Sequence, residues 1–469
     1  MPDPARPAVQ QAIEDAREAA VARLVAFLSI PSVSTDPAYE PEVQRGAAWV
    51  ARRLTELGFA TETVSSAGGH PVVLGTGTEA GPSKPTVLFY GHYDVQPPDP
   101  VELWTSPPFE PAVRPSQTPG DGDAVYARGA SDDKGQVACF LEALQGFRDA
   151  GEPLPVNVKV LIEGEEECGS RTLPTFLKER GKDLQADVAV VSDTAMWDVR
   201  TPTLTYGLRG LVYFDLKLHG PDRDLHSGVY GGTLANPATQ LARVLGRLFD
   251  DDNRITIPGF YDNVAPLGPA ERDEWAGLPF TDEGFVGAVG STASGEKGFS
   301  TLERRWARPS CDVNGLYGGY MGKGAKTVLP SFAGAKVSFR ITGNMEAKRV
   351  AKLFTGWIRG QEVGGCRWEI ENHGEADPVL VRRDSAEVAA AVAACEAIAG
   401  VRPALVRSGA TIPVIADFKK TLGMDTLLLG FGLNADDIHS PDEHFGLGRF
   451  HLGAKVHAEL LSRLGAASA

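Results

Sequence analysis

Hydrophobic positions in the N-terminal part of the chain follow two alternating patterns. Helical spacing and short apolar runs predict helices at 8–29, 42–57, 136–147 and 173–180, and strands at 86–90, 156–162 and 187–191. A loop rich in Pro and Gly is expected at 97–123. Strands that alternate with helices are typical of an α/β fold, in which a mostly parallel sheet is covered by helices on both faces.

A different pattern begins near residue 207. Strict alternation of apolar and polar residues at 211–218 and 336–342 predicts strands of a sheet with one face in water. The same region predicts helices at 236–249 and 346–359, a short strand at 368–371, and irregular structure at 255–310. These features predict an α+β unit that is inserted into the first domain.

The first domain is expected to resume near residue 378. A helix at 385–399, a strand at 426–430 and a closing helix from Arg449 continue the earlier alternation, with a segment at 411–422 between them. The length of 469 residues supports two domains, because one ordinary hydrophobic core does not grow that large. The expected division is 1–206 and 378–469 for the first domain and 207–377 for the inserted one.

Composition narrows the class of protein. The chain is 42% hydrophobic and 23% charged, as soluble globular proteins are. No apolar run is long enough to span a bilayer, and the first residues carry no secretory signal. Five scattered cysteines without a CxxC pair indicate a reducing compartment, so a cytoplasmic protein is expected. A net charge of −15 argues against a nucleic-acid partner.

Side chains that bind metals follow several predicted strands. They are His92 and Asp94, Asp132 and Asp133, Glu165 to Glu167, Asp193, and His439. In an open α/β sheet, ligands bind at the carboxyl ends of the strands, so these side chains are expected to share one crevice. Carboxylates brought together in this way repel one another unless cations lie between them. Two histidines with several carboxylates suit Zn²⁺, with Mn²⁺ or Co²⁺ as alternatives.

The motifs around these residues resemble those of the co-catalytic metallopeptidases. That family includes carnosinase, cytosolic non-specific dipeptidase, aminoacylase, acetylornithine deacetylase and succinyl-diaminopimelate desuccinylase. The similar runs are Gly-His-Tyr-Asp-Val, Arg-Gly-Ala-Ser-Asp-Asp-Lys-Gly, Glu-Gly-Glu-Glu-Glu-Cys-Gly-Ser, Ser-Asp-Thr and Ile-His-Ser-Pro-Asp-Glu, in order from about residue 20 to 460. Three others are most similar to the dipeptidase branch, namely Gly-Leu-Arg-Gly, Asp-Leu-His-Ser-Gly-Val-Tyr-Gly-Gly and Lys-Thr-Val-Leu-Pro.

The resemblance implies a site with two divalent metal ions per subunit, Zn²⁺ before Mn²⁺ or Co²⁺. His92, Asp132 and Asp193 would bind one ion. Asp132, Glu167 and His439 would bind the other, with Asp132 as the bridge. In this family the peptide after the bridging Asp is cis, so a cis bond is expected between Asp132 and the next residue.

The resemblance also implies roles for two further acids. Asp94 would hydrogen-bond His92 and orient its ring. Glu166 matches the general base, which takes a proton from the water between the ions and returns it to the leaving amine. Cys168 stands where related proteins often carry an aliphatic residue. Packing, an additional ligand and a point of oxidation are all open interpretations of this thiol.

The inserted unit resembles a lid and dimerisation domain. His226 matches the histidine that stabilises the oxyanion in the partner subunit's site, which implies a homodimer. Arg340 matches the arginine that binds the substrate's terminal carboxylate, where a planar fork suits a carboxylate. Thr327, Thr411 and His373 match lesser substrate contacts.

The implied function is hydrolysis of dipeptides or short peptides with a free C-terminal carboxylate. A hydroxide held between two metal ions would attack the carbonyl, with Glu166 as general base. An N-acyl amino acid deacylase or desuccinylase of the same fold is the alternative, and a non-catalytic binding protein is an alternative of another class. No Gly-x-Ser-x-Gly motif supports a serine hydrolase. The preferred side chains and the native metal stay open.

Overall fold

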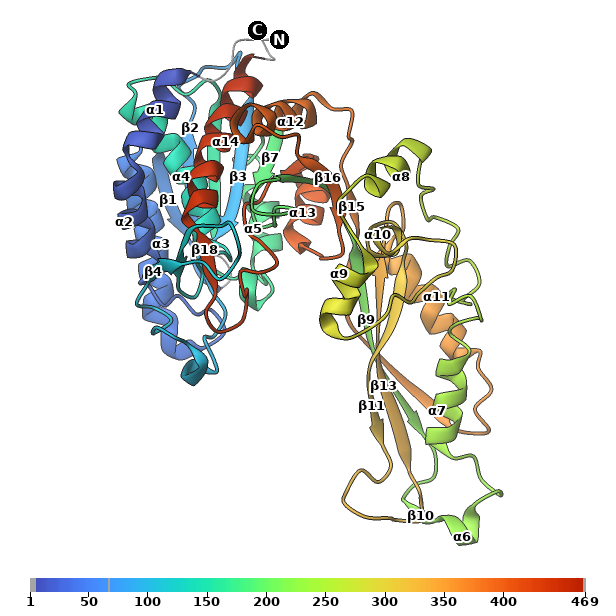
Figure 1. Ribbon diagram of the computed structural model, residues 1–469. Coiled ribbons are helices and arrows are strands. Elements are labelled where there is room, and N and C mark those ends of the chain that lie inside the picture. The colour runs from blue at the N-terminus through green and yellow to red at the C-terminus, as the bar shows by residue number, and fades with distance from the viewer. Residues whose placement is uncertain (1–5, 66–67, 467–469) are drawn as a thin grey trace. The chain divides into compact units, whose positions relative to one another are not determined.

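The computed structural model describes residues 6–65 and 68–466 (Figure 1). The chain divides into two compact units. The first comprises Met1–Tyr206, Val381–Leu405 and Asp417–Ala469, and the second comprises Gly207–Leu380 and Val406–Ala416. None of the helices in the described ranges combines the length and the apolar character that crossing a membrane requires.

The first unit is built on an open sheet. In spatial order its strands are β1 (Ala60–Val64), β2 (Val72–Gly77), β6 (Asn157–Glu163), β3 (Thr86–His92), β7 (Val188–Val191), β17 (Thr426–Leu428) and β8 (Thr203–Leu208). β16 (Ala404–Ser408) also pairs with β8, and β15 (Val379–Leu380) pairs with the last two residues of β8, which belong like β15 to the second unit. The four strands from β6 to β17 are parallel to one another. Antiparallel strands extend the sheet on both sides of this parallel centre.

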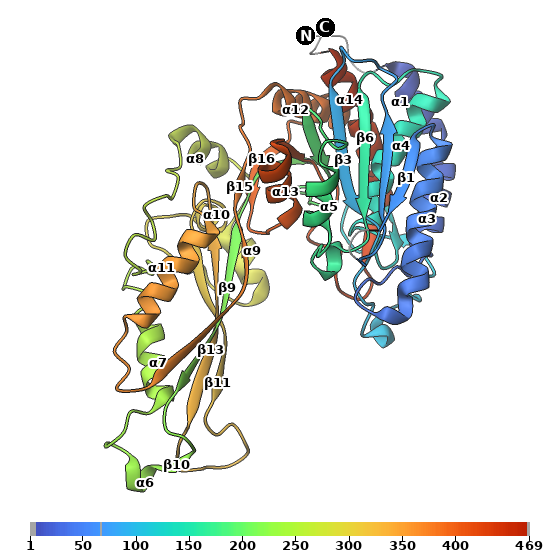
Figure 2. The same ribbon diagram turned by 180° about the vertical axis from the view of Figure 1, so that it is seen from behind.

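Helices cover this sheet (Figures 1 and 2). They are α1 (Pro7–Asp15), α2 (Arg17–Leu28), α3 (Glu40–Glu56), α4 (Lys134–Asp149), α5 (Leu173–Arg180), α12 (Ala386–Ala399) and α14 (Leu447–Ala466), with the short turns η1 (Pro37–Tyr39), η2 (Val101–Leu103) and η3 (Glu166–Cys168). The helix α14 packs against α4 and α12, and α4 lies against β3. A π-helical segment, η5 (Phe418–Leu422), follows α13 (Pro413–Asp417).

The central strand β3 is buried on both faces. Phe89 stacks on Phe140 of α4 with ring centroids 3.9 Å apart, and it meets His457 of α14 edge-on. The next residue, Tyr90, points to the opposite face, because successive side chains of a strand alternate, and contacts Phe418. A strand that is covered on both faces needs no polar alternation, which explains its continuous apolar run.

Several elements of the first unit differ from the sequence pattern. The predicted helix at 8–29 is divided at Ala16, where a ψ of 7° leaves the helical region. The pattern does not mark β1, an edge strand with no buried residue, or β2, which ends in Gly-Thr-Gly. The predicted loop at 97–123 contains β4 (Ala112–Pro115), which joins β5 (Asp123–Tyr126) and β18 (His444–Gly446) in a small sheet.

The second unit has an antiparallel sheet of its own. Its strands, in order, are β11 (Ser310–Gly318), β13 (Phe332–Ile341), β9 (Gly210–His219) and β14 (Arg367–Ala376). Along β9, buried and half-buried residues alternate, so one face packs against α7 (Pro237–Gly246) and α11 (Ala347–Arg359). Phe214 and Phe339 meet Phe354 of α11 in this core. The two sheets confirm the predicted fold class.

Short elements complete the second unit. They are β10 (Leu225–His226) paired with β12 (Val328–Leu329), and α6 (Ser227–Tyr230), α8 (Pro269–Ala276), α9 (Asp282–Val286), η4 (Gly287–Val289) and α10 (Thr301–Trp306). The prediction of irregular structure at 255–310 is wrong in part, because α8, α9 and α10 lie there. These helices are too short for a clear apolar period, although Ser300 and Glu303 form a capping box at the start of α10.

Candidate metal centre

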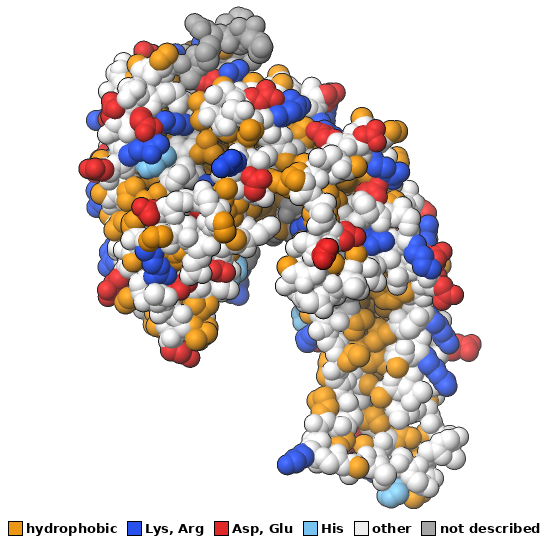
Figure 3. Space-filling view, in the orientation of Figure 1, with side chains coloured by type: hydrophobic (Ala, Val, Ile, Leu, Met, Phe, Trp, Pro, Cys, Tyr) orange, Lys and Arg blue, Asp and Glu red, His pale blue; other side chains and the backbone are white. Residues whose placement is uncertain are grey.

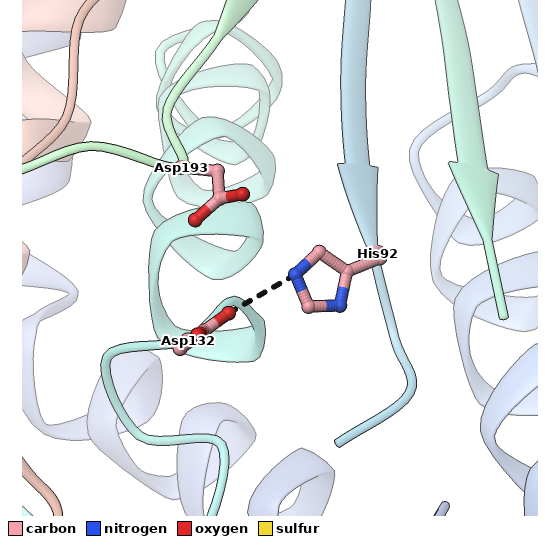
Figure 4. Close-up of side chains that lie close together, drawn as sticks. All are labelled: His92, Asp132 and Asp193. Carbon is pink, nitrogen blue, oxygen red and sulfur yellow. Dashed lines mark ion pairs between the residues drawn. The ribbon is translucent and has the colours of Figure 1, made fainter. Parts of the chain in front are cut away.

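Three side chains meet at the carboxyl ends of β3 and β7 (Figure 4). His92 is the last residue of β3, Asp193 follows β7, and Asp132 lies in the loop before α4. His92 Nε2 is 3.1 Å from Asp132 Oδ1, and one ligand atom of each residue lies within 4.8 Å of the others. Because β3 and β7 are parallel neighbours, their carboxyl ends bring His92 and Asp193 together.

Asp132 also belongs to a second group. Its Oδ2 is 3.0 Å from His439 Nε2, which in turn is 3.3 Å from Glu167 Oε1. Ligand atoms of these three residues again lie within 4.8 Å of one another. Glu167 belongs to η3, after β6, and His439 lies in the loop after β17. All five residues that are expected to bind metal therefore lie in two groups that share Asp132.

Acidic groups crowd this centre. Burial, followed by repulsion from Asp132, raises the pKa of Asp193 to about 7. Burial, joined by the charges of Asp193 and Glu167, raises the pKa of Glu166 to about 8. For Asp132, burial is outweighed by His439 and His92, which hold the pKa of its carboxyl below the usual range. Mutual repulsion of this kind is relieved when a cation lies between the carboxylates.

The donor set fits divalent metal ions. Among the residues that the structure describes, His92 Nε2 is buried and has no hydrogen-bond partner, although Asp132 Oδ1 lies 3.1 Å away. A buried polar atom left without a partner costs free energy, and a metal ion at that position would use its lone pair. Imidazole and carboxylate are ligand types that Zn²⁺ accepts, and three protein ligands leave a position for water or substrate.

Asp94 connects the end of β3 to the turn η3. It is fully buried, and its Oδ1 lies 3.3 Å from His92 Nδ1. The same carboxylate accepts hydrogen bonds from the backbone N–H groups of Glu166 and Glu167, at 3.3 and 3.0 Å. Asp94 therefore contacts the His92 ring and also fixes the turn that carries Glu166 and Glu167.

Glu443 is a residue of the site that the sequence analysis does not identify. It is the last residue of the motif that contains His439. It is fully buried. Its carboxylate accepts hydrogen bonds from Arg128 Nη1 at 2.7 Å and from the backbone N–H groups of Gly129, Ser131 and Asp132 at 2.9, 2.9 and 3.1 Å. The loop that presents Asp132 is therefore held by a residue of the His439 loop. The Asp132–Asp133 peptide within it is cis, as the resemblance implies.

Two other residues hold the ligands in place. Gln96 Nε2 donates a hydrogen bond to Glu167 Oε2 at 2.8 Å, which fixes the carboxylate that faces His439. Asp133 Oδ2 accepts a hydrogen bond from the backbone N–H of His92 at 3.2 Å. Neither contact has a sequence signal, because both join residues that are far apart along the chain.

Cys168 lies beside the centre without joining it. Its Sγ is 3.4 Å from the backbone oxygen of Glu165, and the two ligand groups found among the described residues do not include it. Burial raises the pKa of the Cys168 thiol, which keeps it protonated at neutral pH. These observations favour packing over a ligand role.

In the second unit, Arg340 and Thr411 lie together. Arg340 is half-buried on β13, and its Nη1 donates a hydrogen bond to Thr411 Oγ1 at 2.9 Å. Burial lowers the pKa of Arg340 from its usual value, although arginine stays charged at neutral pH. A charged fork held in this way can bind a carboxylate.

His226 and Thr327 form a second pair. The backbone N–H of Ser227 donates a hydrogen bond to the oxygen of Thr327, which places Thr327 beside His226 at the β10–β12 pairing. The His226 side chain is exposed, and its Nδ1 accepts a hydrogen bond from the N–H of Gly228. His373 lies elsewhere, on β14, where its ring meets Tyr213.

Comparisons with known proteins identify the family of this chain. The family profile described as Peptidase family M20/M25/M40 matches residues 88–463. The Cys-Gly metallodipeptidase of Schizosaccharomyces pombe is 33% identical to this chain over 98% of both proteins. The crystal structure of human carnosine dipeptidase 1 is 29% identical, with a TM-score of 0.77 over 98% of each chain. The M20 family metallo-carboxypeptidase of Sulfolobus solfataricus is 31% identical, with a TM-score of 0.81 over 95% of this chain and 99% of the other. With the profile spanning most of its length, this chain belongs to peptidase family M20/M25/M40.

Proposed function

We propose that this protein is a dinuclear metal-dependent dipeptidase. It hydrolyses dipeptides or short peptides that have a free C-terminal carboxylate. The observation that carries the proposal is that two groups of metal-binding side chains share Asp132 at one edge of the sheet. The related Cys-Gly metallodipeptidase and carnosine dipeptidase support the substrate class. Two divalent ions per chain are proposed, with Zn²⁺ as the native metal.

In the proposed site, His92, Asp132 and Asp193 hold one ion. Asp132, Glu167 and His439 hold the other. Ions bound there would polarise the scissile carbonyl and make water a stronger nucleophile. Glu166 stands beside Glu167 on the turn that Asp94 holds, so its carboxylate is available for proton transfer. In this role Glu166 takes a proton from the attacking water and returns it to the leaving amine.

The second unit supplies the proposed substrate contacts. Arg340 binds the terminal carboxylate with Thr411 beside it, and Thr327 and His373 are lesser contacts. His226 donates a hydrogen bond to the oxyanion in the partner subunit's site, which makes the active protein a homodimer. Since the ring nitrogen Nδ1 accepts from Gly228, Nε2 is the nitrogen that carries the proton and can donate.

Exposed apolar residues of the second unit support the homodimer. Hydrophobic side chains gather on this unit in Figure 3. Leu316 of the edge strand β11 is 65% exposed, and Val229, next to His226 on α6, is 67% exposed. Edge strands with exposed apolar side chains are ready surfaces for pairing with another chain.

A cytoplasmic location is part of the proposal. All five cysteines are free. Free thiols are the usual state in a reducing compartment, whereas exported proteins tend to pair them.

The experiment that tests the substrate class compares three substrates of equal charge at the C-terminus. Hydrolysis rates are measured for the dipeptide Ala-Ala, for N-acetylalanine and for the pentapeptide Ala₅. The proposal expects the dipeptide to have the highest kcat/KM. A clear preference for N-acetylalanine would make the protein a deacylase instead. A preference for the pentapeptide would contradict a dipeptidase and indicate an exopeptidase of longer peptides, as the carboxypeptidase named for the Sulfolobus solfataricus relative is.

A further inference from the structure

A second arginine lies beside Arg340 in the second unit. Arg209 occupies the one-residue step between β8 and β9, and it is half-buried. Its Nε donates a hydrogen bond to the backbone oxygen of Gly409 at 3.3 Å. Its own backbone oxygen accepts a hydrogen bond from Thr411 Oγ1, the hydroxyl that accepts from Arg340. Arg209 therefore holds the segment 409–411 at both ends, and through Thr411 it reaches Arg340.

The two guanidinium groups are not neutralised by the protein around them. Neither forms an ion pair with a carboxylate of the described residues. Burial, followed by the positive charge of Arg340, lowers the pKa of Arg209 to about 10. Asp312 acts on both arginines from a distance, but its side chain is exposed. Two half-buried cations without a paired anion favour a ligand that carries negative charge.

We propose that Arg209 is a specificity-determining residue, which holds the 409–411 segment against Arg340 and adds a second positive charge to the carboxylate subsite. The inference rests on the proposed function, in which Arg340 binds the substrate's terminal carboxylate. In this inference, Arg209 and Arg340 together select substrates with a free carboxylate. The ligand is a single planar carboxylate, the group whose geometry a guanidinium fork matches.

Gly409 is the position where an added side chain would displace the Arg209 guanidinium. A Cβ at Gly409 would lie 2.8 Å from Arg209 Nη2, which is too close for an ordinary contact. Replacement of Gly409 by alanine therefore pushes the Arg209 guanidinium away without removing its charge or touching Arg340. Gly409→Ala therefore tests whether the position of the Arg209 guanidinium matters while its charge is kept.

The test compares Ala-Ala with its C-terminal amide, Ala-alaninamide, in five forms of the enzyme. These are wild type, Arg209→Gln, Gly409→Ala, Arg340→Ala and the control Arg304→Gln. Arg304 is a half-buried arginine of the same unit whose Nε donates to the backbone oxygen of Glu296. Arg209→Gln is expected to raise KM for Ala-Ala about 10-fold to 100-fold, as loss of a charge-assisted hydrogen bond does, with little change in kcat.

The same Arg209→Gln variant should leave kcat/KM for the amide within about threefold of wild type, because the amide has no charge to lose. Gly409→Ala should show a smaller loss that is also confined to Ala-Ala, and Arg304→Gln should show none. Equal losses on the acid and the amide in both Arg209→Gln and Gly409→Ala would overturn the inference, because a merely structural role affects both substrates. If Arg340→Ala is the one variant that loses more activity on Ala-Ala than on the amide, the inference fails while the proposed function stands. If Arg340→Ala also loses equal activity on the acid and the amide, the carboxylate subsite of the proposed function is wrong.

Discussion

Glu166 and Glu167 are neighbours in sequence with different surroundings. Glu167 faces His439 and is held by Gln96. Within the described ranges the Glu166 carboxylate makes no hydrogen bond or ion pair, and its backbone is held by Asp94 and by the N–H of Gly169. A carboxylate that is fixed by its backbone while its oxygens stay available suits proton transfer. A carboxylate whose oxygens are held in position by a neighbouring side chain, as in Glu167, suits metal binding.

Replacing Glu166 with Gln should therefore separate chemistry from metal binding. We expect kcat to fall by about three orders of magnitude while two metal ions stay bound, because only the proton acceptor is removed. Steady-state kinetics and elemental analysis of the purified variant provide the two readouts. Near-normal turnover, or loss of metal, would show that Glu166 is not the base.

His457 predicts a dependence of stability on pH. Burial among aromatic rings lowers its pKa to about 3, while Ser192 Oγ lies 2.9 Å from its Nε2. In the unfolded chain the imidazole titrates near its ordinary value of about 6.5. Between these values the unfolded chain binds a proton that the folded chain does not, so the free energy of unfolding falls as the pH falls.

Replacement of His457 by Phe should remove this contribution. Between pH 7 and pH 5, the metal-free wild type should lose up to about 2 kcal/mol more of its free energy of unfolding than the variant does. Urea unfolding of both proteins at the two pH values measures the difference. Parallel losses in both proteins would mean that His457 is protonated in the folded state.

The sequence indicates the proposed ligand residues more directly than the residues that hold them. His92, Asp132, Glu167, Asp193 and His439 lie in short motifs at strand ends, where the chain order already indicates one crevice. Gln96 and Arg209 act through hydrogen bonds to segments that are distant along the chain, and no local pattern encodes those.

At the scale of elements, one buried carboxylate joins two loops of the centre. Glu443 comes from the loop after β17, yet it receives the backbone donors of the loop between β5 and α4. A backbone segment with three N–H groups that donate to one buried carboxylate has little freedom to move. The position of Asp132 thus depends on Glu443 as well as on the helix that follows it.

Replacement of Glu443 by Gln should weaken metal binding without touching a ligand. The amide presents a donor where the loop needs an acceptor, so the affinity for Zn²⁺ is expected to fall about 10-fold to 100-fold. Competition with a chelator of known affinity measures it. Glu142→Gln is the matched control, because Glu142 is also a buried carboxylate paired with arginine, but on α4 and away from the loop. Equal metal affinity in the two variants would contradict the role of Glu443.

The sequence predicts the long, regular elements and misses the short ones. The buried run of β3 and the alternation of β9 are strong patterns because their burial is uniform. The strands β10 and β12 have two residues each, so their pairing depends on the fold around them. The helices α9 and α10 begin at side-chain caps, and α8 buries Trp275, so none of the three depends on a long apolar face.

At the scale of the whole molecule, every proposed metal ligand belongs to the first unit and His226 belongs to the second. The proposed homodimer places His226 in the partner subunit's site. His226→Ala and Glu166→Ala should each be nearly inactive alone, since loss of an oxyanion donor typically costs about 10²–10³ in turnover. After dissociation and random reassociation of a mixture, roughly half of the dimers carry one of each chain.

Each mixed dimer would hold one site with both residues intact, so activity should return to about a quarter of wild type. Native mass spectrometry verifies that the subunits have exchanged. Activity that stays at the level of the single variants despite exchange would mean that His226 does not act across the interface.

The most direct test of the proposal that this protein is a dinuclear dipeptidase is metal reconstitution. The metal-free protein is titrated with Zn²⁺ while bound metal and the hydrolysis of Ala-Ala are measured together. We predict that activity rises to a plateau at two ions per chain, and that Asp132→Ala, which lacks the shared ligand, retains neither ion nor activity. Full hydrolysis by the metal-free wild type, or a plateau reached at one ion per chain, would contradict the account.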